Sequence, residues 1–595
     1  MNTPARPTPP LLDLAVPRTL DAWVQRFSQP AWHGTHVQGW LFEGLAARRA
    51  AEQQLAAAGV HARFHSAYKP LVHHFLEEQD LDSIAQVRIR CPRVATGSPR
   101  RFQLEAYPLA ALLPEGALQW DEAPTDDGHY ALTLTQRSGE VRHTQVFAPN
   151  RVHTDGIGAT QQSPTGWLRV GRSPGAAGLL DAAESTDYEQ LFEHVLRTVQ
   201  QHPWPCTEPY FERLDIRIDL PGFEQPLPRV DETISTLEAL HEDVYFSLLE
   251  LFQQHSGRPT GDRRLQPGQI VPDVRTAADG TPRVHMVLRS FDTTAQDAAA
   301  WADTTAGQPF DAMGMAPPPA RIAATLAPWP GQRFTATSRQ GRTLHGLYRP
   351  GSAAPVFVSA GQHANETSGV VGALRAAELL QQRPDAHFAL LPLENPDGYA
   401  LHRELCAQAP HHMQHAARYS ALGDDIAYRD AAPFHEREAR QQALALSGAQ
   451  LHINLHGYPA HEWTRPLSGY VPRGFEQWML PKGFFLILRY HAGWLAQGRA
   501  LLEAVTTALQ SVPGLPAYNA RQVALYEQHA GPIPFEVLNG TACMQSETTG
   551  DAPVTLITEF PDETIDGDAF RFAHTVQMAT VLAAEQAWQR IVAAR

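Results

Sequence analysis

Cysteine is scarce in this chain of 595 residues, which contains four. Cys91, Cys206, Cys406 and Cys543 lie far apart, in none of the spacings typical of a metal site. So few scattered thiols exclude a disulfide-built scaffold and indicate reduced cysteines in a reducing compartment. We therefore expect a cytoplasmic protein.

Long apolar runs and an excess of positive charge are also absent. The sequence has no run of about 18 apolar residues, and its Pro-rich start lacks the apolar core of a signal peptide. With 48 Lys and Arg against 63 Asp and Glu, the formal net charge is -15. A surface of this sign repels nucleic acid and anionic lipid, so we expect neither as a main partner.

The length exceeds what one hydrophobic core can hold, so the chain is predicted to divide into domains. Residues 1–320 form an α+β region with an internal division near residue 205. Helices are predicted over residues 41–58, 188–199 and 234–254, and a hairpin over 130–136 and 141–147. A Pro-rich linker follows at 321–332, and nothing in the first region indicates its role.

Residues 333–595 alternate apolar strands with amphipathic helices. A hairpin near residues 333–348 precedes strands at 356–358, 388–393, 451–458 and 555–561, and helices at 370–380, 490–509 and 570–592. Residues 395–399 have the composition of a turn. This alternation predicts an α/β sheet covered on both faces, with chemistry at the carboxyl ends of the strands.

Histidine and glutamate side chains occur at those strand ends. His363 and Glu366 follow Gly361 in the turn before a helix, and His456 precedes Gly457 at the end of a later strand. Two imidazoles and one carboxylate with an open position are the donors of a catalytic zinc site. His452 lies on the same strand face as His456 and is its alternative.

A fourth side chain, Glu559, is predicted to act as the general base. Glu536 and Glu547 are its alternatives.

Five short motifs occur in an order that resembles the zinc carboxypeptidase (M14) family. They are Arg-Gln-Gly-Arg at 339–342, His-Ala-Asn-Glu at 363–366, Asn-Pro-Asp-Gly-Tyr at 395–399, His-Gly-Tyr at 456–458 and Glu-Phe at 559–560. The resemblance covers about residues 330–595. It implies a mixed central sheet flanked by helices and one zinc ion held by His363, Glu366 and His456. It also implies Glu559 as the base and Arg418 as the residue that stabilises the oxyanion.

The resemblance further implies a metallocarboxypeptidase that acts on peptides with a free C-terminal carboxylate. Family members usually hold that carboxylate with an Asn-Arg pair, but residues 423–429 lack the Asn and leave Arg429. Tyr458 is also predicted to contact the substrate, and either Tyr518 or Tyr526 to cover it. Asp425 is predicted to orient a zinc-bound histidine.

Two other functions remain open at this point. Asn365 before Glu366 is similar to desuccinylase and aspartoacylase relatives, which would make the substrate an N-acyl amino acid. A binding protein without catalysis is the third hypothesis. Three further polar clusters are predicted to be solvent-exposed, namely His73-His74, His241-Glu242 and the histidines of 411–415, whereas His461-Glu462 is predicted to be a loop pair.

Overall fold

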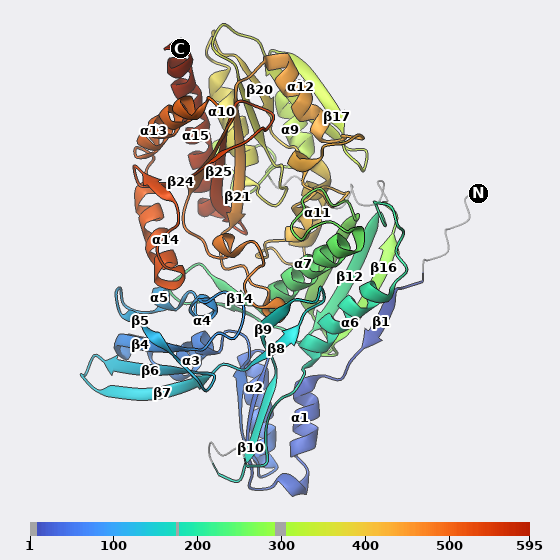
Figure 1. Cartoon of the computed structure of the whole chain (residues 1–595), viewed down its shortest axis with the longest axis vertical. Helices are drawn as coiled ribbons and strands as arrows, with labels where there is room; N and C mark the ends of the chain where they lie inside the picture. The colour runs from blue at the N-terminus through green and yellow to red at the C-terminus, as the bar shows by residue number, and fades with distance from the viewer. Residues whose placement is uncertain (1–8, 174–177, 292–304, 595) are drawn as a thin grey trace.

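A computed structural model of the chain describes residues 9–173, 178–291 and 305–594. Its C-terminal half contains one nine-stranded sheet, drawn in the upper part of Figure 1. The strand order is β17-β18-β20-β19-β21-β25-β22-β24-β23. The bounds are β17 (Gln332–Thr337), β18 (Thr343–Arg349), β19 (Val356–Ala360), β20 (Phe388–Leu391), β21 (Leu451–Pro459), β22 (Phe485–Tyr490), β23 (Glu536–Leu538), β24 (Thr541–Glu547) and β25 (Val554–Glu563).

The sheet is mixed and is covered on both faces. Strands β20, β19, β21 and β25 run parallel, whereas β22 is antiparallel to β25. Val356 and Val358 of β19 pack with α10 (Ser368–Leu380) and α15 (Gly567–Ala593), while Phe357 packs with α12 (Arg437–Ser447) on the opposite face. This alternation follows from the two-residue period of a strand. Helix α13 (Leu495–Leu509) packs beside α15, and α14 (Leu515–Ala530) completes the unit.

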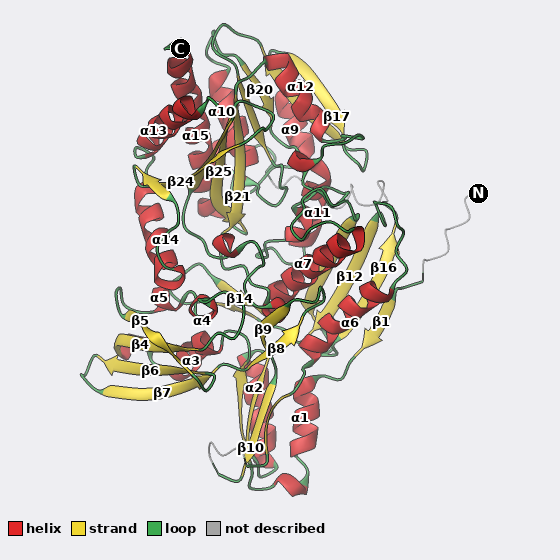
Figure 2. Cartoon of the chain, in the orientation of Figure 1, coloured by secondary structure: helices red, strands yellow, loops and turns green. Residues whose placement is uncertain are grey.

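The N-terminal region contains three four-stranded sheets, shown with their helices in Figure 2. The first, β1-β16-β12-β15, combines β1 (Leu12–Ala15), β12 (Arg213–Leu220), β15 (Gln269–Thr276) and β16 (Arg283–Arg289) with α6 (Asp187–Gln201) and α7 (Thr236–Ser256). The second, β11-β10-β2-β3, combines β2 (His36–Leu41), β3 (His61–Ser66), β10 (Trp167–Gly171) and β11 (Leu180–Ala183) with α1 (Thr19–Phe27) and α2 (Leu45–Ala57).

The third sheet, β5-β4-β6-β7, is the one nearest to α14. It comprises β4 (Ile84–Pro92), β5 (Leu118–Thr125), β6 (His129–Gln136) and β7 (Val141–Phe147), with α3 (Pro70–Glu78), α4 (Arg101–Glu105) and α5 (Leu109–Leu112) nearby. Two ribbons, β8 (Asn150–Thr154) with β9 (Thr160–Pro164) and β13 (Glu224–Pro226) with β14 (Thr233–Ser235), complete the region. The predicted hairpin over 130–136 and 141–147 is confirmed.

Helix α7 joins the two halves through buried ion pairs. Glu238 pairs with His461 at 2.8 Å, and Glu242 pairs with His415 at 2.6 Å. The predicted exposure of His415 and His241-Glu242 is therefore wrong, and His73 and His412 are buried as well. His461 lies in the loop after β21, as predicted, and is buried there. Charged groups tolerate burial here because partners from the other half neutralise them.

Three local predictions need correction. Residues 321–332 are not a linker throughout, because α9 (Pro319–Leu326) buries Ile322 and Leu326 in the C-terminal core. Residues 395–399 begin α11 (Pro396–Cys406), since Asn395 caps that helix by accepting from the Gly398 N–H. The helix expected from residue 490 starts at Leu495, after strand β22.

Of the helices in the described ranges, none has both the length and the apolar character needed to cross a membrane.

Candidate metal centre

The loop after β19 presents the first two candidate ligands. Gly361 follows the strand with φ +65°, a conformation that favours glycine. Its carbonyl accepts a hydrogen bond from the Asn395 N–H, which fixes the loop against the next strand end. His363 and Glu366 then lie in the short segment before α10.

Three donor atoms converge at this loop. The Nδ1 atom of His363 lies 2.8 Å from Glu366 Oε1, and His456 Nδ1 lies 2.9 Å from Glu366 Oε2. The two Nδ1 atoms are 3.1 Å apart. Ligands of a tetrahedral zinc ion with bonds near 2.0 Å lie about 3.3 Å from one another, so the spacing fits such an ion.

Within the described ranges, this is the one group of His, Cys, Asp or Glu side chains whose donor atoms approach this closely. His452, the alternative to His456, instead contacts Ser359 Oγ at 2.8 Å and stacks on Phe357.

The protonation states suit a cation. Burial lowers the pKa of His456 to about 4, so its ring is neutral near pH 7 and Nδ1 has a lone pair to donate. Burial alone would raise the pKa of Glu366, but His363, Arg418 and His456 lower it well below its usual value. Neutral imidazole and ionised carboxylate are the forms that bind metal.

Neighbouring groups orient these donors. Asp425 Oδ2 lies 3.3 Å from His363 Nε2, so that Nδ1 faces the centre. The Gly457 N–H donates to Glu366 Oε2 at 3.0 Å. A Cβ atom at position 457 would lie 1.8 Å from Asp562 Oδ1, which explains the glycine.

Glu559 lies directly opposite His456 in the pairing of β25 with β21. Both side chains border a cavity of about 540 Å³ that runs along this face of the sheet. Burial and the nearby carboxylate of Glu366 raise the pKa of Glu559 well above its usual range, while Arg418 and Lys482 oppose the shift. The alternatives Glu536 and Glu547 are exposed and do not border this cavity, as far as the described residues show.

Arg418 also borders the cavity. Its Nη1 atom donates to Glu366 Oε1 at 2.7 Å and lies 3.5 Å from Glu563 Oε1. The guanidinium of Arg418 is thus held beside the candidate metal ligands.

The prediction for Arg429 is wrong in position. Its guanidinium pairs with Asp424 at 2.6 Å and with Glu436 at 2.5 Å, and its side chain is 1% exposed. Arg429 does not border the cavity. These two carboxylates neutralise the charge of Arg429. A comparison of motifs cannot detect such pairing.

The predicted tyrosines have different surroundings. The ring of Tyr458 borders the cavity, but its hydroxyl donates to the Gly483 carbonyl at 2.7 Å and is engaged. Tyr518 stacks on Phe560 in the core. Neither Tyr518 nor Tyr526 borders the cavity, whereas Tyr419 and Tyr428 do, as judged from the described residues.

Several residues near the site have no signal in the sequence. Lys482 lies 4.6–5.7 Å from four aromatic rings, and burial lowers its pKa to about 7. Phe246 and Arg263 of the N-terminal region border the cavity, and Arg263 lies 3.5 Å from Asp425 Oδ2. No motif marks these positions, because each is defined by contact with a distant segment.

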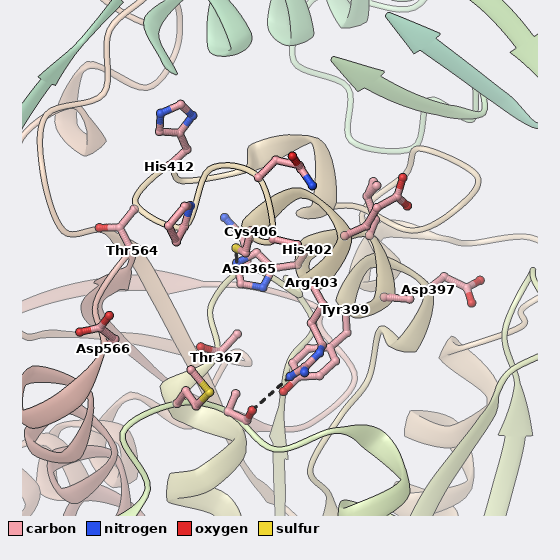
Figure 3. A pocket seen from close by; sticks show the side chains of 18 of the residues that line it. Asn365, Thr367, Asp397, Tyr399, His402, Arg403, Cys406, His412, Thr564 and Asp566 are labelled. Carbon is pink, nitrogen blue, oxygen red and sulfur yellow. Dashed lines mark hydrogen bonds between the residues drawn. The ribbon is translucent and has the colours of Figure 1, made fainter. Parts of the chain in front are cut away.

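A second cavity has a volume of about 680 Å³, and Figure 3 shows residues that line it. Asn365 and Thr367 of the loop border it, as do His402, Arg403 and Cys406 of α11. None of the three convergent donors belongs to its lining.

No protein-family model matches the sequence, and no curated protein matches it significantly. Among solved structures, the chain is similar to a metallo-carboxypeptidase from Pseudomonas aeruginosa in complex with (2-guanidinoethylmercapto)succinic acid. The identity is 19%, over 46% of this chain and 68% of that chain, with a TM-score of 0.28. Carboxypeptidase A from Helicoverpa armigera is 12% identical over 53% of this chain and 90% of its own, with a TM-score of 0.27. A likeness at this level does not establish a family or an activity for this chain.

Proposed function

We propose that this chain is a metal-dependent hydrolase, specifically a zinc metallocarboxypeptidase acting on peptides with a free C-terminal carboxylate. The observation that supports it best is the convergence of two imidazole nitrogens and one carboxylate within about 3 Å of one another, beside Glu559. These donors fit zinc because the imidazoles and the single carboxylate leave a position open for substrate.

In the proposed mechanism, a bound zinc ion would polarise the amide carbonyl and lower the pKa of a water molecule. Glu559 takes the proton of the attacking water and passes it to the leaving amine. A raised pKa suits a carboxylate for this task, because it must hold the proton between the two steps. Arg418 supplies positive charge where the carbonyl oxygen becomes an anion.

The proposal is tested by metal analysis of the full-length protein and its His363→Ala variant, with a peptide-library cleavage profile read by mass spectrometry. We expect one zinc per chain in the wild type and little in the variant.

We further expect Glu559→Gln to keep its zinc and to lose about 10²- to 10⁴-fold in turnover. Glu547→Gln is the matched control, since this glutamate is exposed on β24. Unchanged turnover in Glu559→Gln would move the base elsewhere, and a wild type without bound metal would end the proposal.

The remaining expectations stay predictions. They are a cytoplasmic location, the absence of nucleic-acid and membrane partners, and a catalytic unit confined to the C-terminal half.

A further inference from the structure

Six arginines border the cavity that contains Glu559, and five of them are paired with a carboxylate of the protein. The pairs are Arg263–Asp425, Arg264–Asp262, Arg418–Glu366, Arg437–Asp551 and Arg440–Glu394, at 3.5, 3.0, 2.7, 3.0 and 2.7 Å. The sixth, Arg489, is half-buried, and no described residue forms a hydrogen bond or ion pair with its side chain.

Arg489 lies on the same face of the sheet as Glu559. In the pairing of β22 with β25, Phe485 is opposite Glu559, Ile487 is opposite Ile557, and Arg489 is opposite Thr555. Steps of two residues return to the same face, so these pairs form one row along the cavity floor. Glu559 follows Thr555 by four residue steps along the strand, which corresponds to about 13 Å.

The side chains of this row change from apolar to cationic with increasing distance from Glu559. Next to Glu559, the floor consists of the apolar side chains of Ile487 and Ile557. Beyond them, Arg489 lies with Thr548 and Thr555 at the far end of the lining. The cavity therefore combines an acid-base group, an apolar stretch and a cationic end in that order.

Among the residues that the structure describes, no carboxylate forms an ion pair with Arg489. Asp551 is engaged by Arg437, and Asp430 lies 3.4 Å from Arg264. A guanidinium has a rigid fork of donors that matches a carboxylate, so an unpaired one in a cavity favours an anionic ligand group.

We propose that Arg489 binds the side-chain carboxylate of the residue released by hydrolysis, so that the preferred substrates are peptides ending in glutamate or aspartate. This inference rests on the proposed function. The α-carboxylate of that residue is bonded to its Cα, so it lies closer to the scissile amide than the side-chain carboxylate does. The apolar step formed by Ile487 and Ile557 leaves room for the methylene groups of a longer acidic side chain.

The test compares kcat/KM of the zinc-loaded full-length protein for three otherwise identical peptides ending in Glu, Gln or Leu. We expect the Glu peptide to be preferred over the Gln peptide by about 10- to 100-fold, as for a charge-assisted hydrogen bond pair. Arg489→Gln should remove this preference. Arg489→Glu should favour a peptide ending in Lys.

Arg264→Gln is the matched control, because Arg264 borders the same cavity but is held by Asp262. It should keep the wild-type preference. The side chain of Arg489 forms no hydrogen bond or ion pair in the described part of the protein, so its replacement should leave the thermal unfolding midpoint nearly unchanged.

A binding experiment separates this inference from the proposed function. Zinc-loaded Glu559→Gln is titrated with N-acetyl-glutamate and N-acetyl-glutamine in a calorimeter. We expect the acid to bind about 10- to 100-fold more tightly, and the difference to vanish when Arg489→Gln is added. Equal binding of the two ligands, or equal cleavage of the Glu and Gln peptides, overturns the role of Arg489. Selective binding without cleavage of any peptide by the wild type overturns the proposed hydrolase and leaves Arg489 as an acid-binding residue.

Discussion

Individual buried side chains near the candidate metal centre are held in place by partners from distant segments. Asp425 is one of them, since its carboxylate contacts His363 Nε2 and also accepts from Gln362 Nε2 at 2.7 Å. Burial would raise the pKa of Asp425, but His363, Arg263 and Arg418 lower it, so it stays ionised. An ionised partner at Nε2 fixes the ring and strengthens Nδ1 as a donor.

We therefore predict that Asp425→Ala weakens zinc binding by about 10- to 100-fold. The measurement is competition with a chelator of known affinity on the full-length protein. Asp430→Ala serves as the control, because Asp430 borders the cavity and contacts Arg264 rather than a candidate ligand. If both variants bound zinc as tightly as the wild type, Asp425 would have no part in orienting His363.

At the scale of elements, helix α10 begins two residues after Glu366 and packs against both the sheet and α15. Two glycines permit this close approach. A Cβ atom at position 369 would lie 2.9 Å from Leu455 Cβ, and one at 372 would lie 2.5 Å from Gln577 Cβ. The loop that contains Glu366 thus leads into a helix whose buried face has no room for a side chain at these two positions.

Gly372→Ala is predicted to destabilise the protein by about 1–3 kcal/mol through overpacking. This cost exceeds the gain in helix propensity of about 1 kcal/mol. The thermal unfolding midpoint should fall, and Glu378→Ala on the exposed side of the same helix should leave it nearly unchanged. A midpoint of Gly372→Ala equal to that of the wild type would show that α10 and α15 can move apart without cost.

At the scale of the whole molecule, buried ion pairs connect the two halves. The pair of Glu238 on α7 with His461 is one example. Burial disfavours the charged imidazole, but Glu238 outweighs this effect and raises the pKa of His461 to about 9. The folded-state pKa of His461 lies above its unfolded value of about 6.5. The pair therefore contributes its full stabilisation below about pH 6.5.

We predict that this stabilisation is lost as the pH rises from about 6.5 through about 9. The shift corresponds to roughly 3 kcal/mol at most. Unfolding midpoints measured between pH 6 and 10 should fall more steeply in the wild type than in His461→Gln, which has no such group to titrate. Parallel curves for the two proteins would exclude a charged His461 in the folded state.

The local features of this protein follow from its sequence alone. The β6–β7 hairpin, the end of β19 before Gly361 and the span of α10 are expressed in neighbouring residues, because periodicity and glycine conformation are short-range properties. The strand end predicted at Gly457 is wrong, since β21 continues to Pro459. His363, Glu366 and His456 could be proposed as ligands for the same reason, since His363 and Glu366 follow the end of β19 and His456 precedes a glycine in β21.

Tertiary structure alone decided how the charges are distributed. From the sequence, Arg429 is predicted to bind substrate and Arg489 has no predicted role. In the structure, Arg429 pairs with Asp424 and Glu436, whereas Arg489 borders the cavity without a carboxylate partner in the described part of the chain. Whether a buried charge is neutralised depends on groups that come close only on folding. The contribution of Arg263 to the cavity could not be predicted from the sequence either, because this residue reaches the cavity only on folding.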